Sequence, residues 1–360
     1  MAKNAKYRQI VDWITSEIGR KELLPGDKLE SENSICARFS VSRQTVRHAL
    51  GILARDGVIE SRQGSGSFVK EPDGTEQKST GGQTIAIVST YVNGYIFPNV
   101  IQGMEQVLGN AGFNIQINFT HNRKGTEKDI LKKLMDDPDL AGVIIEPTMS
   151  GLPNTNRKYY DRLKKQRIPV LFFNSFYEGL DIPHVSLNDE AAGRSLVDYL
   201  ASMGHKKIGG IFKLDDGQGR LRYKGFMKGV SAAGLSVNES NVIWIDTDDQ
   251  MHMGFCKEKI LRRLQNCTAC VCYNDVVAHD LTEMCVQDKI RIPEDLSIVS
   301  IDNSELARLN FVPLTSVKHP MAQLGIKAAQ NMLHMIKEPD FAATYEFDAQ
   351  LELRNSVRKL

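Results

Sequence analysis

Short runs of apolar residues alternate with helical patterns from Thr84 to the end of the chain, and this alternation constrains the fold more than any other feature. The runs at residues 85–88, 170–173 and 269–273 are apolar along their length. A strand of this kind must be covered on both faces, which is typical of parallel sheets flanked by helices. The sequence therefore predicts an α/β fold with parallel sheets over residues 84–360.

The alternation occurs in two successive series, which predicts two lobes with a cleft between them. The first series places strands at residues 85–88, 114–119, 141–145 and 170–173. The second places strands at residues 208–212, 242–245, 269–273 and 297–301, a helix that runs on to Leu264, a long helix at 323–336 and an edge strand at 345–353. In open α/β sheets, ligands bind at the carboxyl ends of the strands.

Polar and aromatic residues gather at those strand ends. The candidates for ligand binding are Tyr91, Tyr95, Phe97, Glu146, Asn174, Asp216, Asn274 and Asp302, with Arg222 early in a helix that follows one of the strands. Carboxylates accept hydrogen bonds from hydroxyl groups, Arg and Asn donate them, and aromatic rings cover apolar C–H faces. The set therefore suits a neutral polyhydroxylated ligand, although any one member could instead only cap a helix.

A different pattern occupies residues 29–69, where two short helices are expected to begin after Ser31 and Ser42. The second helix has an apolar stripe of Val46, Ala49, Leu50 and Leu53. Its opposite face carries four donor-rich side chains that we expect to be unpaired by nearby acids: Arg43, Gln44, Arg47 and His48. One packed face and one donor-rich face suit a helix in a DNA major groove. The alternative is a small helical domain with a solvated charged face.

Two short strands at residues 58–60 and 67–69 are predicted to form a hairpin with a Gly-rich tip, so the head reads as a winged helix-turn-helix of α+β type. Residues 71–83 are polar, contain Pro and Gly and lack periodicity. We expect them to link a DNA-binding head at residues 1–70 to an effector and dimerisation body at residues 84–360.

Composition describes an ordinary protein, with a formal net charge of +1 and 25% charged residues. The N-terminus lacks the apolar core of a signal peptide and no apolar run reaches membrane-spanning length, so we expect a cytoplasmic protein with no membrane partner. Cys267, Cys270 and Cys272 are expected to be buried thiols, because zinc would need a fourth ligand at a suitable spacing. We expect no metal and no cofactor.

Several motifs in the head resemble the winged-helix domain of GntR-type bacterial regulators: Pro-Gly-Asp-x-Leu at 25–29, Val-Ser-Arg-x-Thr-Val-Arg at 41–47 and Gly-x-Gly-x-Phe-Val at 64–69. The resemblance implies that the head binds double-stranded operator DNA. The candidate contacts to bases or phosphates are Lys6, Glu30, Ser31, Arg43, Gln44, Thr45, Arg47, Gln63 and Gly64. Many members have Arg where this chain has Asn33.

The body resembles the effector domain of LacI-type repressors and the periplasmic sugar-binding proteins. The resemblance is carried by Arg222-x-x-Gly225-Phe226, Tyr273-Asn274-Asp275 and Ile301-Asp302-Asn303, among other segments. In that family, the Arg, the Asn and the Asp of these motifs hold the sugar, which implies the same role for Arg222, Asn274 and Asp302. A two-lobed periplasmic-binding-protein-like domain is therefore expected.

The combination of this head and this body resembles the arabinose-responsive repressors of Gram-positive bacteria. Tyr91-x-x-x-Tyr95-Ile96-Phe97-Pro98, Ile145-Glu146-Pro147-Thr148 and the segment 315–320 support the match, and the last adds His319 to the candidate ligand residues. The resemblance implies a homodimeric repressor that binds a palindromic operator and is released by L-arabinose. The residues alone indicate only a neutral sugar or polyol; a purine stays open, whereas the acids disfavour a phosphosugar by repulsion.

The competing interpretation is an enzyme, for instance a glycoside hydrolase that uses two of Glu146, Asp216 and Asp302. The sequence has no nucleophile elbow, no HExxH motif and no Walker-type phosphate loop. We therefore expect a regulator and not an enzyme.

Overall fold

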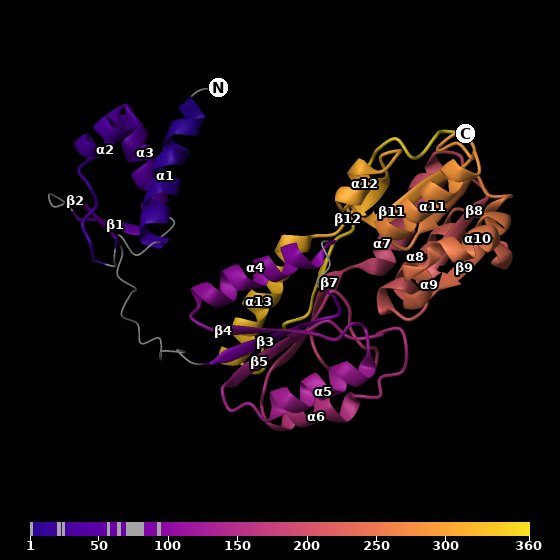
Figure 1. Ribbon diagram of the computed structural model, residues 1–360, viewed down its shortest axis with the longest axis horizontal. Helices are drawn as coiled ribbons and strands as arrows, with labels where there is room; N and C mark the ends of the chain where they lie inside the picture. Colours follow the sequence, from indigo (N-terminus) through magenta and orange to yellow (C-terminus); the bar gives the residue numbers. More distant parts are fainter. Residues whose placement is uncertain are drawn as a thin grey trace. The chain divides into compact units, whose positions relative to one another are not determined.

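The computed structural model describes residues 3–19, 23, 26–55, 58–62, 66–69, 83–91 and 95–360. The chain divides into two compact units, Met1–Lys78 and Ser79–Leu360. The first unit contains the predicted head and the second contains the predicted body (Figure 1).

The head is a winged helix-turn-helix, as predicted. It contains α1 (Lys3–Gly19), α2 (Glu32–Phe39), α3 (Arg43–Arg55) and an antiparallel hairpin of β1 (Ile59–Arg62) and β2 (Gly66–Val69). Ser40 adopts the left-handed conformation at the end of α2, so the turn into α3 is short. The predicted apolar stripe of α3 is buried against Ile10, Ile14 and Ile35.

The body contains two six-stranded sheets. Lobe 1 has the strand order β13-β7-β6-β5-β3-β4, and all of its pairings are parallel. Its strands are β3 (Thr84–Ser89), β4 (Asn114–Phe119), β5 (Leu140–Ile145), β6 (Val170–Phe173), β7 (His184–Leu187) and β13 (Tyr345–Phe347). Its helices are α4 (Phe97–Asn110), α5 (Lys124–Met135), α6 (Arg157–Lys165) and α13 (Met321–Lys337).

Lobe 2 has the strand order β14-β12-β11-β10-β8-β9, parallel except at β14. Its strands are β8 (Ile208–Lys213), β9 (Val242–Ile245), β10 (Ala269–Cys272), β11 (Ser297–Asp302), β12 (Thr315–Lys318) and β14 (Leu351–Glu352). Its helices are α7 (Asp189–Ser202), α8 (Gly217–Ala232), α9 (Thr247–Met251), α10 (Lys257–Leu264), α11 (Asp275–Gln287) and α12 (Glu305–Leu309), with short 3₁₀ turns at Glu239–Asn241 and Met253–Cys256.

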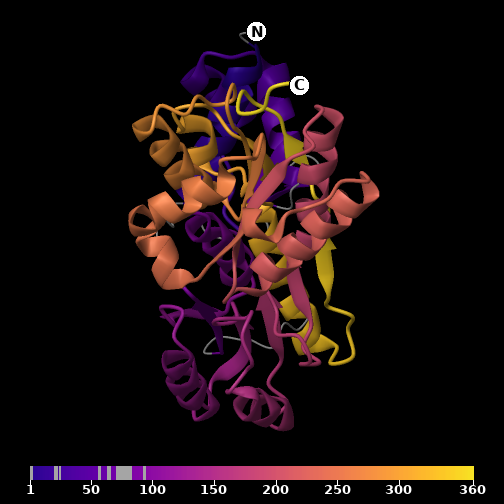
Figure 2. The same cartoon turned by 90° about the vertical axis from the view of Figure 1, so that its right-hand side faces the viewer.

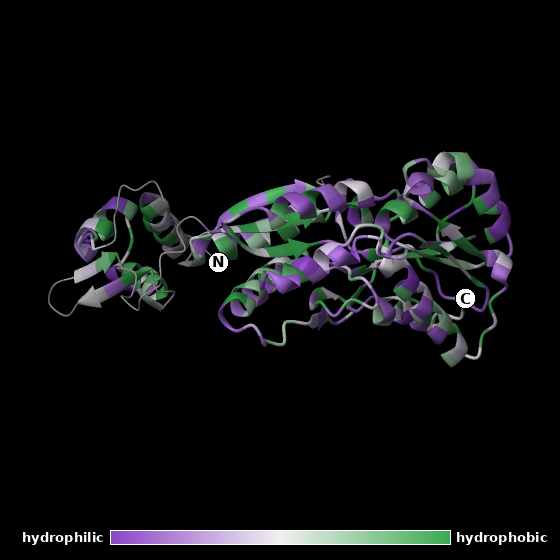
Figure 3. Ribbon diagram, turned by 90° about the horizontal axis from the view of Figure 1, so that it is seen from below, coloured by the Kyte–Doolittle hydropathy of each residue, from purple (hydrophilic) through white to green (hydrophobic). Residues whose placement is uncertain are grey.

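Both faces of each sheet are covered, which explains why the central strands are apolar along their length. In lobe 1, α4 and α13 pack on one face and α5 and α6 on the other (Figure 1). In lobe 2, α7 and α8 cover one face, and α10 and α11 cover the other. Figure 3 shows apolar strands enclosed by helices that carry their hydrophilic residues outward.

The structure corrects the predicted order of the lobes, because the chain crosses between them three times, after β7, after β12 and between β13 and β14. The long helix predicted for lobe 2 is α13 of lobe 1, where its backbone meets α4 at Gly325. A Cβ added there would lie 1.9 Å from Val100 O. The predicted edge strand is two strands in different sheets, and the C-terminal segment runs along both lobes (Figure 2).

The helix predicted to run to Leu264 is also interrupted. A capping box at Asp246 starts α9, and His252 leaves the helical conformation, so α10 begins separately. The Cys prediction is confirmed: Cys267, Cys270 and Cys272 are buried in the core of lobe 2. Within the described residues, no helix is long and apolar enough to cross a membrane. The same residues hold no group of three or more His, Cys, Asp or Glu side chains placed to bind a metal.

Candidate functional site

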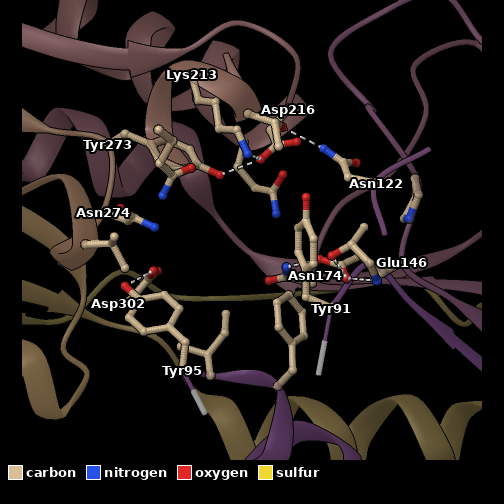
Figure 4. A pocket seen from close by; sticks show the side chains of 18 of the residues that line it. Tyr91, Tyr95, Asn122, Glu146, Asn174, Lys213, Asp216, Tyr273, Asn274 and Asp302 are labelled. Carbon is tan, nitrogen blue, oxygen red and sulfur yellow. Dashed lines mark hydrogen bonds and ion pairs between the residues drawn. The ribbon is translucent and has the colours of Figure 1, made fainter. Parts of the chain in front are cut away.

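A cavity of about 390 Å³ lies between the two lobes, at the carboxyl ends of their strands (Figure 4). Every predicted ligand residue except His319 lines it: Tyr91, Tyr95, Phe97, Glu146, Asn174, Asp216, Arg222, Asn274 and Asp302. The carboxyl ends of both sheets face the same cleft, so residues far apart in the sequence meet there. The structure thus brings this part of the predicted set together.

His319 lies behind the cavity wall and does not line it. Its Nε2 is 2.9 Å from Asn174 Oδ1, and its Nδ1 has no hydrogen-bond partner among the described residues. Burial lowers the pKa of His319 to about 3, so the ring is neutral at physiological pH. As the tautomer protonated on Nε2, it donates to Asn174 and orients an amide that does line the cavity.

Glu146 is the carboxylate of lobe 1, and its orientation is fixed by hydrogen bonds. One oxygen accepts from Thr90 N at 2.8 Å, Thr90 Oγ1 at 2.6 Å and Ser89 Oγ at 3.1 Å. The other accepts from Asn174 Nδ2 at 2.8 Å. Burial raises the pKa of Glu146, whereas the bonds from Thr90 and Asn174 act to lower it. Asn174 reaches this carboxylate from the left-handed conformation, at φ 64°, which Asn tolerates better than most residues.

Arg222 organises the wall that lobe 2 contributes. Its Nε donates to Asp189 Oδ1 at 2.7 Å, its Nη1 donates to Tyr273 O at 2.6 Å, and its Nη2 lies 3.5 Å from Asp302 Oδ1. The guanidinium also lies 4.9 Å from the centre of the Tyr273 ring. Close contact between α7 and α8 holds Arg222 in place, since a Cβ added at Gly193 would lie 2.1 Å from Arg222 O.

Asp302 ends β11 and carries two unusual features. Its backbone has a φ of 111°, a conformation that L-residues adopt only when the surrounding structure enforces it. Burial raises the pKa of Asp302 to about 7, although the Arg222 charge acts to lower it. The neutral form of this carboxyl is therefore more stable, relative to the ionised form, than in an ordinary Asp.

Several cavity residues were absent from the sequence prediction. Lys213 Nζ lies 2.9 Å from Asp216 Oδ2, and Tyr273 Oη donates to the same oxygen at 2.9 Å (Figure 4). Lys213 directly follows the predicted strand 208–212, so the rule that ligand residues lie at strand ends could have included it. In the structure, Lys213 is the last residue of β8. Others give no local signal, since they reach the cavity from loops, from the first turn of α8 and from α9: Thr90, Asn122, Gln218, Thr247, Gln250 and Met251.

The cavity can therefore hold an uncharged molecule with many hydroxyl groups. Glu146, Asp216 and Asp302 are fixed acceptors, and Arg222 and Lys213 are fixed donors. Tyr91, Tyr95, Phe97 and Tyr273 add aromatic surface around them. Hydrogen bonds to ionised partners are stronger than neutral ones, and buried partners left unpaired penalise a ligand that lacks a matching hydroxyl.

The exposed face of α3 was predicted to carry side chains unpaired by nearby acids, and the structure corrects this prediction. Arg43, Gln44 and Arg47 are exposed, but they are not all unpaired. Glu32 Oε2 accepts from Arg43 Nε at 2.6 Å, and Glu32 Oε1 accepts from Arg47 Nε at 3.1 Å. The hydrogen bond from Arg43 lowers the pKa of Glu32. The pairing arises because the short turn at Ser40 brings the start of α2 beside α3.

The remaining predicted DNA contacts are divided between described and undescribed residues. Ser31 caps α2 by accepting from Ser34 N at 3.2 Å, and Glu30 accepts from Arg38 Nη2 at 2.6 Å. Thr45 Oγ1 lies 2.9 Å from Ser42 Oγ at the start of α3. Gln63, Gly64 and the side chain of Lys6 lie outside the described residues.

Comparison with known proteins matches both parts of the chain. Residues 6–69 match the gntR family of bacterial regulatory proteins, and residues 197–357 match the periplasmic binding protein-like domain. The chain is 35% identical over 360 residues to an arabinose metabolism transcriptional repressor of Geobacillus stearothermophilus, covering 99% of this chain and 98% of that protein.

Two further proteins are similar. A repressor of the same description from Halalkalibacterium halodurans is 35% identical over 344 residues, covering 92% of this chain and 90% of that protein. Among solved structures, the transcription regulator CcpA of Lactococcus lactis aligns with a TM-score of 0.68 and 22% identity, covering 77% of this chain and 99% of that chain.

Proposed function

The chain belongs to the family of arabinose metabolism transcriptional repressors with a gntR-type head, and from this premise we propose that it binds operator DNA through α3 and releases it when L-arabinose fills the inter-lobe cavity. Its relatives and its fold are those of transcriptional regulators rather than enzymes. Response to a sugar follows from the family. The choice of L-arabinose, the operator and the dimer are our own proposals.

The observation that carries the sugar proposal is the pairing of fixed acceptors with fixed donors around one cavity. Asp216 and Asp302 can each accept from a hydroxyl, while Lys213 and Arg222 lie within the same wall as donors. Glu146 supplies a further acceptor from the other lobe. These carboxylates repel a phosphosugar, which favours a neutral ligand. A single pentose ring suits the cavity of about 390 Å³.

The proposal for DNA binding rests on α3. Its apolar stripe is buried in the head, whereas Arg43, Gln44 and Arg47 are exposed. Arg43 and Arg47 would contact bases and phosphates, and their pairing with Glu32 holds the two side chains on one face before DNA binds. A homodimer would place two such helices in successive major grooves of a palindromic operator.

Sugar and operator are then linked through the relative stability of two arrangements of the protein. If the sugar weakens operator binding, the operator must weaken sugar binding by the same factor. The test is a pair of titrations with an operator fragment selected from random DNA by the protein itself. Calorimetry measures L-arabinose affinity with and without this fragment, and electrophoretic mobility measures operator affinity with and without L-arabinose.

We expect both affinities to fall by the same factor, and no change with D-glucose or adenine as control ligands. Equal L-arabinose affinity in the presence and absence of the operator would contradict the switch. Release of the operator by adenine and not by L-arabinose would assign the cavity to a purine.

A further inference from the structure

A second cavity of about 760 Å³ lies beside the first. The two cavities share the wall residues Tyr91, Asn122, Thr247 and Met251. Beyond this wall, lobe 1 contributes Met149 and Leu152, and lobe 2 contributes Leu214 and Asp215. The rest of its lining is charged or titratable: His121, Arg123, Lys124, Asp246 and Asp248. The second cavity thus combines a few apolar side chains with many hydrogen-bonding groups, which could contact the hydroxyl groups of another sugar ring.

Two polar atoms that border the second cavity have no partner among the described residues. They are Tyr91 Oη and Asp215 Oδ1, and both are inaccessible to solvent as atoms. Asp215 is 3% exposed, and its other oxygen is already bonded to Thr247. A hydroxyl group could donate to Asp215 and accept from Tyr91 only after the side chains that cover these two atoms have moved, as they would when the wall between the cavities opens.

A chain of hydrogen bonds crosses the wall between the cavities and also joins the lobes. Asn122, in the loop between β4 and α5 of lobe 1, donates from Nδ2 to Thr247 Oγ1 of lobe 2 at 2.8 Å, a bond drawn as a dashed line at Asn122 in Figure 4. Thr247 Oγ1 donates in turn to Asp215 Oδ2 at 2.5 Å. Asn122 Oδ1 accepts from Met149 N at 2.8 Å, which fixes the amide from the other side.

Asn122 is held rigidly in this position. It is 6% exposed and adopts the left-handed conformation at φ 50°. Both ends of its amide are bonded, so it cannot turn aside without breaking a partly buried hydrogen bond. A sugar chain that passed from one cavity to the other at this point would have to separate atoms that are 2.8 Å apart.

We propose that the Asn122–Thr247 bridge is a partition that selects a single sugar ring. A monosaccharide ends inside the first cavity and lets the bridge form, whereas a longer sugar would reach into the second cavity and keep the bridge open. Because the bridge joins the lobes, it rejects longer ligands and stabilises lobe closure with the same bond. This inference rests on the proposed function, since it takes the first cavity to be the sugar site.

The test compares L-arabinose with arabinobiose, the disaccharide of two arabinose units, by calorimetry on the full chain. The variants Asn122→Ala and Thr247→Ala open the partition, and Thr155→Ala alters an exposed threonine of lobe 1 that lines neither cavity. We expect the wild type and Thr155→Ala to bind arabinobiose at least about tenfold more weakly than L-arabinose, and the two opened variants to reduce that ratio by about tenfold.

A double variant identifies where the second ring goes. Leu214→Trp places a larger side chain at the second cavity, so adding it to Asn122→Ala should move the ratio of the two affinities back towards the wild-type value. The proposal of a partition is wrong, and the proposed function unaffected, if the wild type binds both sugars equally. The same holds if Asn122→Ala and Thr247→Ala leave the ratio of the arabinobiose and L-arabinose affinities unchanged. Failure of the wild type to bind L-arabinose overturns the proposed function and the partition with it.

Discussion

The hydroxyl of Tyr95 donates a 2.7 Å hydrogen bond to Asp302 Oδ2 across the cleft. Tyr95 precedes α4 of lobe 1, and Asp302 ends β11 of lobe 2, so this bond joins the lobes at the carboxylate that faces the cavity. The other oxygen of Asp302 faces Arg222. Both oxygens of the carboxylate are therefore positioned by protein groups before a ligand arrives.

Tyr95→Phe is expected to weaken L-arabinose binding, and to do so more at neutral than at alkaline pH. The Tyr95 hydrogen bond acts to lower the pKa of Asp302, which burial raises to about 7 overall. Without that bond the pKa rises further, so more of the carboxyl is protonated and cannot form a charge-assisted bond to a sugar hydroxyl. Calorimetry between about pH 6 and about pH 9 should show a loss of ~1–3 kcal/mol near neutrality that shrinks as pH rises. A loss independent of pH would contradict this role.

Asp302 should also make folding stability depend on pH in a defined direction. Burial raises its pKa from 3.8 to about 7 in the folded protein, so the folded state retains a proton that the unfolded state releases. The stabilisation of the folded state by this proton is fully present below the pKa of Asp302 in the unfolded chain, and it is lost as pH rises towards 7. Urea unfolding should show the stability of the wild type relative to Asp302→Asn decreasing from about pH 4 to about pH 7 by a few kcal/mol at most.

The same comparison removes the effect of His319. Burial lowers the pKa of His319 to about 3, so its own contribution rises with pH over the acidic range, opposite to that of Asp302. Because both proteins contain His319, the difference between them reports Asp302 alone. Parallel stability curves for the wild type and Asp302→Asn would show that Asp302 is already ionised in acid.

Replacement of Arg222 should cost both stability and sugar affinity. Its side chain is 4% exposed and pairs with Asp189 and Asp302, which are equally buried. Arg222→Met leaves two buried carboxylates without their partner and should lower the free energy of unfolding by ~3–5 kcal/mol. Arg222→Lys retains the charge but loses the forked geometry, so its sugar affinity should also fall.

A matched control for this prediction is Arg194→Met on α7. Arg194 pairs with Asp198, but its side chain is 54% exposed, so its loss should change stability by less than about 1 kcal/mol. Urea unfolding measures stability in all three variants, and calorimetry measures L-arabinose affinity. Similar stability losses for the methionine variants at 222 and 194 would argue against a buried charge network.

Arg43→Ala is expected to weaken operator binding and to relax the choice of sequence. Arg43 is exposed at the start of α3, where the proposed groove contact begins. A lost base contact costs ~1–3 kcal/mol, and a lost phosphate contact lowers the salt dependence of binding without changing specificity. Titration of the selected operator and of a scrambled fragment at several salt concentrations distinguishes the two cases. Unchanged affinity for both fragments would remove Arg43 from the interface.

Glu32→Gln tests the ion pairs that link α2 to α3. Glu32 binds both Arg43 and Arg47, and it places a negative charge on the face proposed to meet DNA. Removing the charge should strengthen binding to a scrambled fragment, because the repulsion between Glu32 and phosphate is lost. The difference in affinity between operator and scrambled DNA should therefore become smaller. A uniform loss of affinity for both fragments would instead show that Glu32 mainly holds the arginines in position.

Much of the cavity could be predicted from the sequence because its residues share a simple rule. Glu146, Asn174, Asn274 and Asp302 each follow an apolar strand, and parallel strands bring their carboxyl ends together. Arg222 was predicted from its position early in a helix that follows a strand, and a motif of the family resemblance includes it as well. Lys213 was not predicted, because the predicted strand ended one residue too early. The end of a strand is hard to place where an apolar run is followed by lysine, whose aliphatic stem can also be buried.

Other features depend on contacts that no local pattern encodes. The Asn122–Thr247 bond joins a loop of lobe 1 to the start of α9, 125 residues further along the chain. The Arg43–Glu32 pair depends on the angle of the turn between two helices. The helical period predicted α13 correctly as an element but could not tell which sheet it covers. In the structure α13 packs in the core of lobe 1 and approaches α4 closely at Gly325, a contact that no local sequence pattern encodes.

Three separate segments of the backbone connect the two lobes. Sliding one lobe sideways would stretch all of them at once, whereas twisting about an axis through them bends each only a little. These connections therefore favour rotation of one lobe against the other over sliding. In such a rotation, residues far from the three connections move the most. A small molecule bound between the lobes at a point far from the connections would therefore change the angle between the lobes the most.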